Sequence, residues 1–217
     1  MRLADSETEL TTAATDALLG AVCLGLGLWL WSTPTAAAWK RGLWVSAFAL
    51  LSSGAWIGAV LHGLQLPAAT IAAAWRGLYL SLGWAVALFL VAATCDWKGE
   101  REARALLPWA LAIGVLLVGA TERLGRSFLV FAVYEAVSTA MALAIYGTLA
   151  VSGLRPGAIL IAAGIVLSLV AAAVQVSSLS LRIVVRFDHN GLFHLVQTVA
   201  VVIIAVGVRI SLPAGAP

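Results

Sequence analysis

Residues 188–210 read DHNGLFHLVQTVAVVIIAVGVRI, and this stretch joins a polar cluster to a long apolar run. The run is long enough to cross a hydrocarbon core of roughly 30 Å as a helix, which takes about 20 residues. Its polar start holds His189 and His194, two of only three histidines in the chain, beside Asp188. Ionisable groups are costly at the edge of a membrane, so their clustering predicts a functional site.

The whole chain has the composition of an integral membrane protein. Of its 217 residues, 62% are hydrophobic and only 11% are charged. Further long apolar runs precede the last one, and the short alternating strands of a β-barrel are absent. We therefore predict an all-α membrane protein, a single seven-transmembrane-helix bundle, with helices at about 17–31, 42–64, 68–93, 105–120, 127–150, 158–181 and 189–210.

Several classes of function are excluded by the charges and the cysteines. The formal charge is only +3 and the basic residues are scattered, so membrane lipids, and not nucleic acid, are the expected partners. Cys23 and Cys95 lie in or at the end of apolar segments, which argues against a disulfide. A retinal protein needs a lysine in its last helix, whereas Lys40 and Lys98 are expected in loops.

Seven crossings place the N-terminus on the same side as the links that follow the second, fourth and sixth helices; we call this side the N-side. Seven basic residues flank the opposite side, against five or six on the N-side, including Arg123 and Arg126. This bias predicts an outside N-terminus and a cytoplasmic C-terminus. The topology also brings His62, at the end of the second helix, to the same side as His189 and His194.

Three histidines at one depth predict a joint metal site. Three neutral imidazoles with an open fourth position are typical of catalytic zinc, which activates a bound water near neutral pH. For each histidine taken singly, a hydrogen-bonding role at the membrane interface is the alternative. Their shared depth favours His62, His189 and His194 as metal ligands.

A carboxylate beside such a site would orient a ligand or relay a proton. Asp188, Glu122 and Glu135 are the candidates, and we assign catalytic roles to Asp188 and Glu135. Glu135 lies well inside a helix and needs a partner, for which Arg76 is the expected counter-charge.

The histidine at the end of the second helix and the Leu-Phe-His start of the last helix resemble the CREST superfamily, which includes alkaline ceramidases and the progestin and adipoQ receptors. The resemblance implies seven helices and a zinc ion held by one histidine of helix two and two of helix seven. It also implies hydrolysis of a lipid amide or a related bond. Carried over by position, His62 and His194 match two of the three ligands. The last helix is also similar to uncharacterised bacterial membrane proteins that begin it with His-Asn-x-x-x-His, which implies a bacterial inner membrane and no activity.

The chain departs from the CREST pattern at three places. The family spaces its helix-seven histidines four apart, whereas His189 and His194 are five apart, which turns them by roughly 140° instead of 40°. Asn190 occupies the family's position. His189 reaches the site if Asp188 and His189 form the non-helical cap of the helix, and Asn190 and Asp188 are the alternatives for completing the site. The helper serine of helix two is replaced by Gly58, and an early aspartate of helix three is absent.

The leading hypothesis is therefore a zinc-dependent intramembrane hydrolase that acts on a lipid amide or ester. A non-catalytic protein that senses a lipid or a metal is the alternative, and a haem protein with two histidine ligands ranks third. Bound zinc with turnover, bound zinc without turnover, and a Soret band distinguish the three. The substrate, the metal and the oligomeric state are left open by the sequence.

Overall fold

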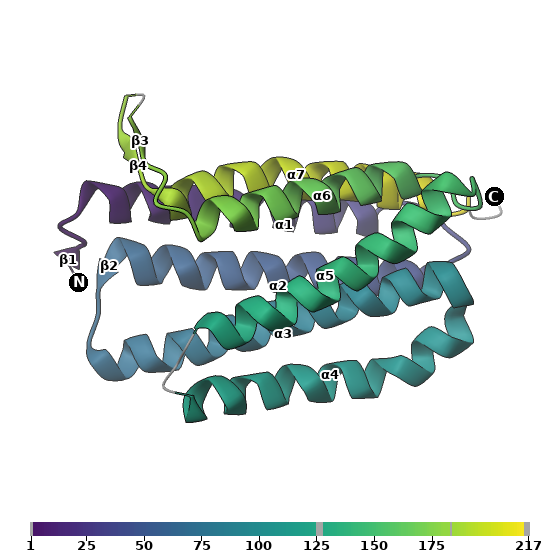
Figure 1. Cartoon of the computed structure of the whole chain (residues 1–217), viewed down its shortest axis with the longest axis horizontal. Helices are drawn as coiled ribbons and strands as arrows, with labels where there is room; N and C mark the ends of the chain where they lie inside the picture. Colours follow the sequence, from purple (N-terminus) through teal and green to yellow (C-terminus); the bar gives the residue numbers. More distant parts are fainter. Residues whose placement is uncertain (1, 125–127, 183, 215–217) are drawn as a thin grey trace.

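The computed structural model describes residues 2–124, 128–182 and 184–214 (Figure 1). The described residues form seven helices that run between the two ends of the bundle, and each is long and apolar enough to cross a membrane. The predicted all-α, seven-helix fold is confirmed. The helices are α1 (Glu7–Trp31), α2 (Ala38–Gly63), α3 (Ala68–Lys98), α4 (Glu100–Arg123), α5 (Phe128–Val151), α6 (Ala158–Gln175) and α7 (His189–Ser211).

Six of the helices form a ring. Around the ring, each helix contacts the next in the order α7, α1, α2, α3, α5 and α6, and α6 contacts α7 again. Helix α4 lies outside the ring and packs on α3. Helix α5 crosses the bundle obliquely, from α3 at its start to α6 at its end (Figure 1). Towards the N-side, α5 diverges from α6 (Figure 1).

Two small strand pairs lie at the N-side end. Strand β1 (Arg2–Leu3) pairs with β2 (Leu64–Gln65), directly after α2. Strand β3 (Leu181–Arg182) pairs with β4 (Arg186–Phe187) in a hairpin between α6 and α7. These pairs place the N-terminus beside the α2–α3 link and the hairpin at the same end, as the predicted topology requires (Figure 1).

Close packing of α6 on α7 depends on glycines. Gly157 starts α6 with a φ of 80°, and a Cβ there would lie 2.1 Å from the carbonyl oxygen of Gly207. A Cβ on Gly207 would in turn lie 2.8 Å from Ile161 Cγ1. Between membrane helices, association depends on such close backbone approach, because lipid tails are as apolar as the side chains they would replace.

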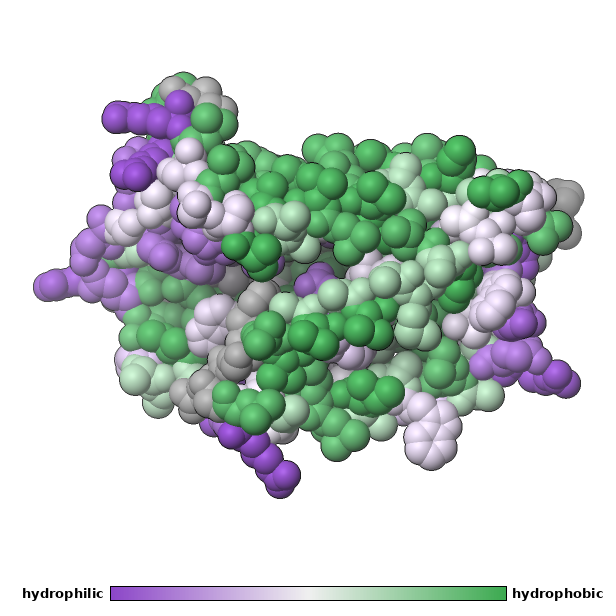
Figure 2. Space-filling model, in the orientation of Figure 1, coloured by the Kyte–Doolittle hydropathy of each residue, from purple (hydrophilic) through white to green (hydrophobic). Residues whose placement is uncertain are grey.

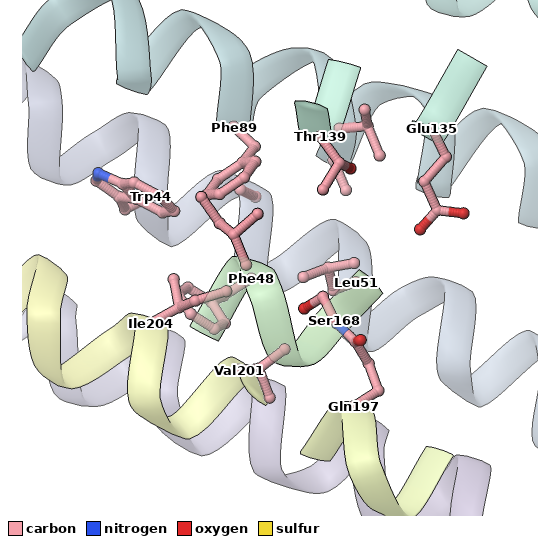
Figure 3. Close-up of a pocket in the computed structure, with 14 residues that line it drawn as sticks. Trp44, Phe48, Leu51, Phe89, Glu135, Thr139, Ser168, Gln197, Val201 and Ile204 are labelled. Carbon is pink, nitrogen blue, oxygen red and sulfur yellow. The ribbon is translucent and has the colours of Figure 1, made fainter. Parts of the chain in front are cut away.

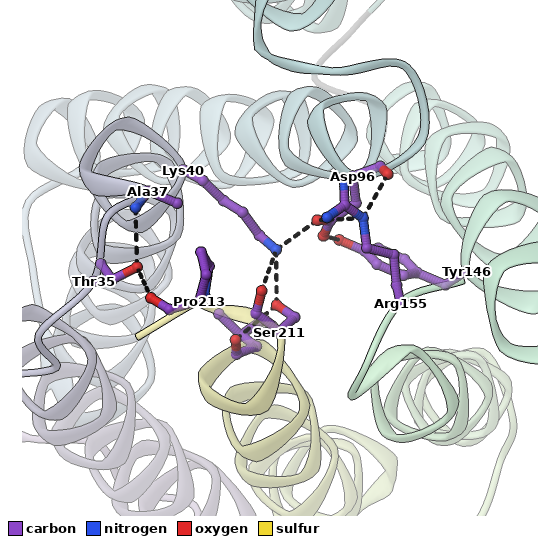
Figure 4. Close-up of polar contacts among 9 residues, drawn as sticks. Thr35, Ala37, Lys40, Asp96, Tyr146, Arg155, Ser211 and Pro213 are labelled. Atoms are coloured by element: carbon purple, nitrogen blue, oxygen red, sulfur yellow. Dashed lines mark hydrogen bonds and ion pairs between the residues drawn. The ribbon is translucent and has the colours of Figure 1, made fainter. Parts of the chain in front are cut away.

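The opposite end of the bundle is joined by a buried polar cluster (Figure 4). Lys40 of α2 forms an ion pair with Asp96 of α3 and donates to Ser211 Oγ of α7 at 2.8 Å. The Tyr146 hydroxyl donates to Asp96 Oδ2 at 3.0 Å, and Arg155 Nε donates to the Asp96 carbonyl at 3.0 Å. One carboxylate thus connects α2, α3, α5 and the α5–α6 link.

Several predicted boundaries were wrong. Helix α1 begins at Glu7 and not near residue 17, since Glu7 and Glu9 lie in its first turn and favour the positive end of the helix dipole. Helix α6 ends at Gln175, because the Ser177 hydroxyl accepts from Leu179 N–H and starts a turn.

The linkers are also shorter than expected. Gly99, with a φ of 105°, alone separates α3 from α4, so Lys98 ends a helix. Lys40 lies in the first turn of α2 and not in a loop. The expected start of the fifth helix at Ser127, and Arg126 before it, lie outside the described residues.

Candidate functional site

A cavity of about 350 Å³ lies in the N-side half of the ring. Its wall includes four of the five predicted site residues, namely His62, His189, His194 and Glu135. The fifth, Asp188, is not part of the wall. The structure therefore brings the three histidines to one cavity, although they come from α2 and from two faces of the start of α7.

The structure adds an aspartate that the sequence analysis did not select. Asp16 of α1 lines this cavity and is only 4% exposed. Its Oδ1 lies 3.1 Å from His194 Nε2, and His194 is likewise buried. The other oxygen of Asp16, Oδ2, is buried and has no hydrogen-bond partner among the described residues. An unpaired buried carboxylate oxygen is costly, so this half of the carboxylate is available to a ligand.

The hydrogen bonds around His194 determine which ring nitrogen carries a proton. His194 Nδ1 lies 3.2 Å from Thr15 Oγ1. That hydroxyl is 2.9 Å from the carbonyl oxygen of Thr12, to which it donates. Because its one proton is used there, Thr15 Oγ1 accepts from Nδ1–H. The Nε2 lone pair of a neutral His194 then faces a carboxylate oxygen of Asp16, and two acceptors at this distance require a cation between them, either a proton or a metal ion.

The room around Asp16 depends on Gly58 of α2. A Cβ at this position would lie 2.8 Å from Asp16 Oδ2 and 2.9 Å from Oδ1. Any side chain at position 58 would therefore displace the carboxylate from its place against α2. Gly58 also lies one helical turn before His62, so the two residues share one face of α2.

His62 is oriented by Glu9 of α1. Its Nδ1 lies 2.7 Å from Glu9 Oε2, and both side chains are partly exposed. A carboxylate only accepts, so Nδ1 carries the proton and the Nε2 lone pair of the neutral ring is free. Such a carboxylate–histidine pair is the usual arrangement behind a metal-binding imidazole.

Helix α7 begins at His189, and the cap that precedes it is Asp188. Asp188 Oδ1 accepts from Gly191 N–H at 2.9 Å and from the Thr12 hydroxyl at 3.0 Å. This side chain thus caps α7 and attaches it to α1. His189 is the first residue of the helix and not part of a non-helical cap, and it still lines the cavity. A catalytic role for Asp188 stays a prediction.

Glu135 of α5 connects the large cavity to a second one of about 90 Å³. Figure 3 shows Glu135, Ser168 and Gln197 near one end of this smaller cavity, with Trp44 and Phe89 towards the other. Arg76, the expected partner of Glu135, instead forms an ion pair with Glu122, and its Nε lies 3.1 Å from Glu122 Oε1. Among the described residues no ion pair or hydrogen bond is found for the Glu135 carboxylate, which leaves it free to meet a ligand.

The large cavity approaches the surface of the ring where α5 and α6 diverge. Phe131 and Glu135 of α5, and Gln175 at the end of α6, form part of its wall. Figure 2 shows a hollow on this face, with polar atoms at its floor and mainly apolar surface around it. In a membrane-spanning bundle this face lies towards the lipid.

Within the ranges that the structure describes, no three His, Cys, Asp or Glu side chains are grouped closely enough to hold a metal ion as they stand. Among the described residues, Asp16 and His194 form a buried pair of such groups. Asp16 was missed because the first predicted helix began at about residue 17, which left Asp16 outside it. A helical signal was present, since Thr12, Asp16, Leu19 and Cys23 follow one another at three- or four-residue spacing and form one buried stripe of α1.

Comparison with known proteins adds a family and no activity. No curated protein matches the chain, and no solved structure matches it. The model of one family, described as "Family of unknown function (DUF6962)", matches residues 11–213. The match covers α2 to α7, all of α1 but its first turn, and every cavity residue named above. The chain therefore belongs to this family.

Proposed function

We propose that this protein is a zinc-dependent intramembrane hydrolase that acts on a lipid amide or ester in the N-side cavity. The observation that carries the proposal is the buried pair of Asp16 and His194. Its acceptor atoms face each other at 3.1 Å, and the second Asp16 oxygen has no partner in the described chain.

The donor atoms fit a zinc ion. With bond lengths of about 2.0–2.1 Å, two neighbouring ligands of a tetrahedral zinc ion lie roughly 3.3 Å apart. The separation of His194 Nε2 from Asp16 Oδ1 is close to this value. His62, whose Nε2 is free, would supply the third donor, and His189 is the other histidine in the wall. One histidine from helix two and one from helix seven also agree with the resemblance to the CREST superfamily.

The chain's own residues would divide the work. Thr15 and Glu9 hold the two imidazoles in the tautomers that leave Nε2 free. Bound zinc would supply an activated water and polarise a carbonyl group. Glu135, across the cavity and without a partner in the described chain, would take up and return a proton. The amides of Gln197 and Gln175, which line the wall, would bind the polar part of the substrate.

The shape of the site supports a lipid substrate. The hollow between α5 and α6 faces the membrane, and the apolar second cavity continues from the polar one into the bundle (Figure 3). An amphiphile that enters sideways would leave its headgroup bond beside Asp16 and His194. Its chain would then pass between Leu51, Val86 and Gln197, which line both cavities.

A non-catalytic lipid-binding sensor is the second candidate. One observation favours it: the described residues contain no preformed group of three metal ligands. In that case the cation between Asp16 and His194 is a proton, and the cavity binds lipid without turnover.

Metal analysis of the purified protein tests the proposal. We expect about one zinc ion per chain in the wild type and a loss of more than tenfold in Asp16→Ala and His194→Ala. His189→Ala, which removes a cavity histidine outside the proposed set, should keep most of the metal. A wild-type protein that binds no metal after purification without chelators and addition of zinc contradicts the hydrolase and leaves the sensor.

A further inference from the structure

The hairpin between α6 and α7 extends sideways from the bundle at the N-side, roughly across the helix axes (Figure 1). Every described residue from Val176 to Arg186 is exposed. Apolar side chains are prominent among them, with Val184 84% exposed and Leu181 48% exposed. No acidic residue occurs between positions 176 and 187, whereas Arg182 and Arg186 are both basic.

This position and composition fit a membrane interface. The helix axes define the membrane normal, so an element that extends across them at the end of α6 and α7 lies along the bilayer surface. There the apolar side chains of Leu181 and Val184 can enter the boundary of the acyl chains, while arginines stay at headgroup level. If the hairpin lay in water, these apolar side chains would stay exposed to solvent.

We propose that the hairpin is a lipid-docking element that binds anionic phospholipid headgroups of the N-side leaflet. Neither Arg182 nor Arg186 forms an ion pair with a described carboxylate. The Arg186 guanidinium contacts only the Ser180 hydroxyl, Nε to Oγ at 3.4 Å, and Glu7 accepts from the Arg186 backbone N–H instead. Two unpaired guanidinium groups on one hairpin suit a phosphate, which they bind through paired N–H donors.

The hairpin is held in a defined place, which makes it a site and not a loose tail. The Thr11 hydroxyl of α1 donates to the Arg186 carbonyl at 2.8 Å, and the Ser180 hydroxyl donates to the Phe187 carbonyl at 3.0 Å. The chain enters the hairpin from Gln175 and Val176, both in the cavity wall. A headgroup bound here lies beside the hollow between α5 and α6. The inference does not depend on metal binding or hydrolysis.

The test places a fluorescent probe on the hairpin of the full-length protein. Cys23 and Cys95 are buried, so an environment-sensitive maleimide should label Val184→Cys selectively. The labelled protein is reconstituted in nanodiscs of phosphatidylcholine alone or of an equimolar mixture with phosphatidylglycerol. We expect blue-shifted emission and quenching by spin-labelled lipid, both stronger with phosphatidylglycerol.

The double change Arg182→Gln and Arg186→Gln should remove the phosphatidylglycerol effect. The hairpin should stay in place, because the Thr11 and Ser180 hydroxyls that hold it donate to the main-chain carbonyls of Arg186 and Phe187 and not to the arginine side chains. A probe at Ser152→Cys, exposed at the opposite end of the bundle, is the matched control and should not respond to the arginine changes. Water-like emission at position 184 in both lipids, or a phosphatidylglycerol effect that survives the loss of both arginines, would overturn the proposal.

Discussion

His194 Nε2 lies 3.1 Å from Asp16 Oδ1, so the last helix meets the first through two buried acceptors. The contact joins residues from opposite ends of the chain, and both side chains are buried. Burial of a carboxylate beside an imidazole costs free energy unless a cation or a ligand binds between or beside them. This relationship motivates most of the predictions below.

Asp16→Asn keeps the size of the side chain and removes its charge. We expect zinc binding to fall by more than tenfold, because the amide is a poorer metal ligand and can donate to His194 Nε2 instead. The fold should persist, since that new hydrogen bond satisfies both groups. Metal content and thermal unfolding in detergent are the measurements; full zinc occupancy in this variant would remove Asp16 from the proposed ligands.

Two variants of Asp188 distinguish its role as a helix cap from a catalytic role. Asp188→Ala should lower the free energy of unfolding by about 1 kcal/mol, the usual cost of a lost helix cap. Asp188→Asn should keep stability close to that of the wild type, because asparagine caps equally well. If lipid turnover falls strongly in Asp188→Asn while stability is kept, Asp188 has the catalytic role that the sequence analysis assigned to it.

Gly58→Ala tests the space beside the carboxylate. The added Cβ would lie 2.8 Å from Asp16 Oδ2, so the carboxylate must move and zinc binding should be lost. Gly25→Ala on α1 is the matched control, since a Cβ there meets nothing within 4 Å. Both changes replace glycine inside a helix, which favours the helix by up to about 1 kcal/mol. Equal zinc binding in the two variants would show that the space beside Asp16 is not needed.

Glu135→Gln separates metal binding from chemistry. Because Glu135 is proposed to carry a proton and not to hold the metal, zinc content should be unchanged. Hydrolysis of a panel of acyl amides and esters should fall by about 10²–10⁴-fold, the usual contribution of a general acid or base. Loss of zinc together with activity would instead place Glu135 among the ligands or in the core.

Lys40→Met leaves Asp96 buried without its main counter-charge at the far end of the bundle. We expect a loss of about 3 kcal/mol in the free energy of unfolding, with zinc binding kept. The double variant Lys40→Met, Asp96→Leu should recover part of the lost free energy of unfolding, although the Tyr146 hydroxyl then lacks its acceptor. Denaturant titration in detergent measures the free energy of unfolding of the wild type and of each variant.

Arg104→Gln is the exposed control for this ion pair. Arg104 and Glu100 form a surface pair at 2.7 Å, and its loss should cost at most about 0.5 kcal/mol. A cost as small for Lys40→Met would mean that the cluster in Figure 4 does not stabilise the bundle.

The apolar runs were sufficient to predict seven helices, and the parity of seven crossings placed His62 beside His189 and His194. Both follow from local properties: the length of a run against the thickness of a membrane, and the alternation of its ends. The start of α1 was missed for a local reason as well. Its buried polar stripe, from Thr12 to Asp16, resembles a soluble leader unless the helix period is followed through to Leu19 and Cys23.

The sequence alone did not predict which charged groups pair with each other. Arg76 pairs with Glu122 and not with Glu135, and Lys40 of α2 pairs with Asp96 of the neighbouring α3, because contacts between helices depend on their rotation and spacing. What the sequence determined by itself is the class of protein and the depth of its polar residues, since both depend on hydrophobicity along one chain. Only the tertiary structure decided that Asp16 meets His194, because α1 and α7 become neighbours when the ring closes, and Gly58 leaves the carboxylate the space to face the cavity.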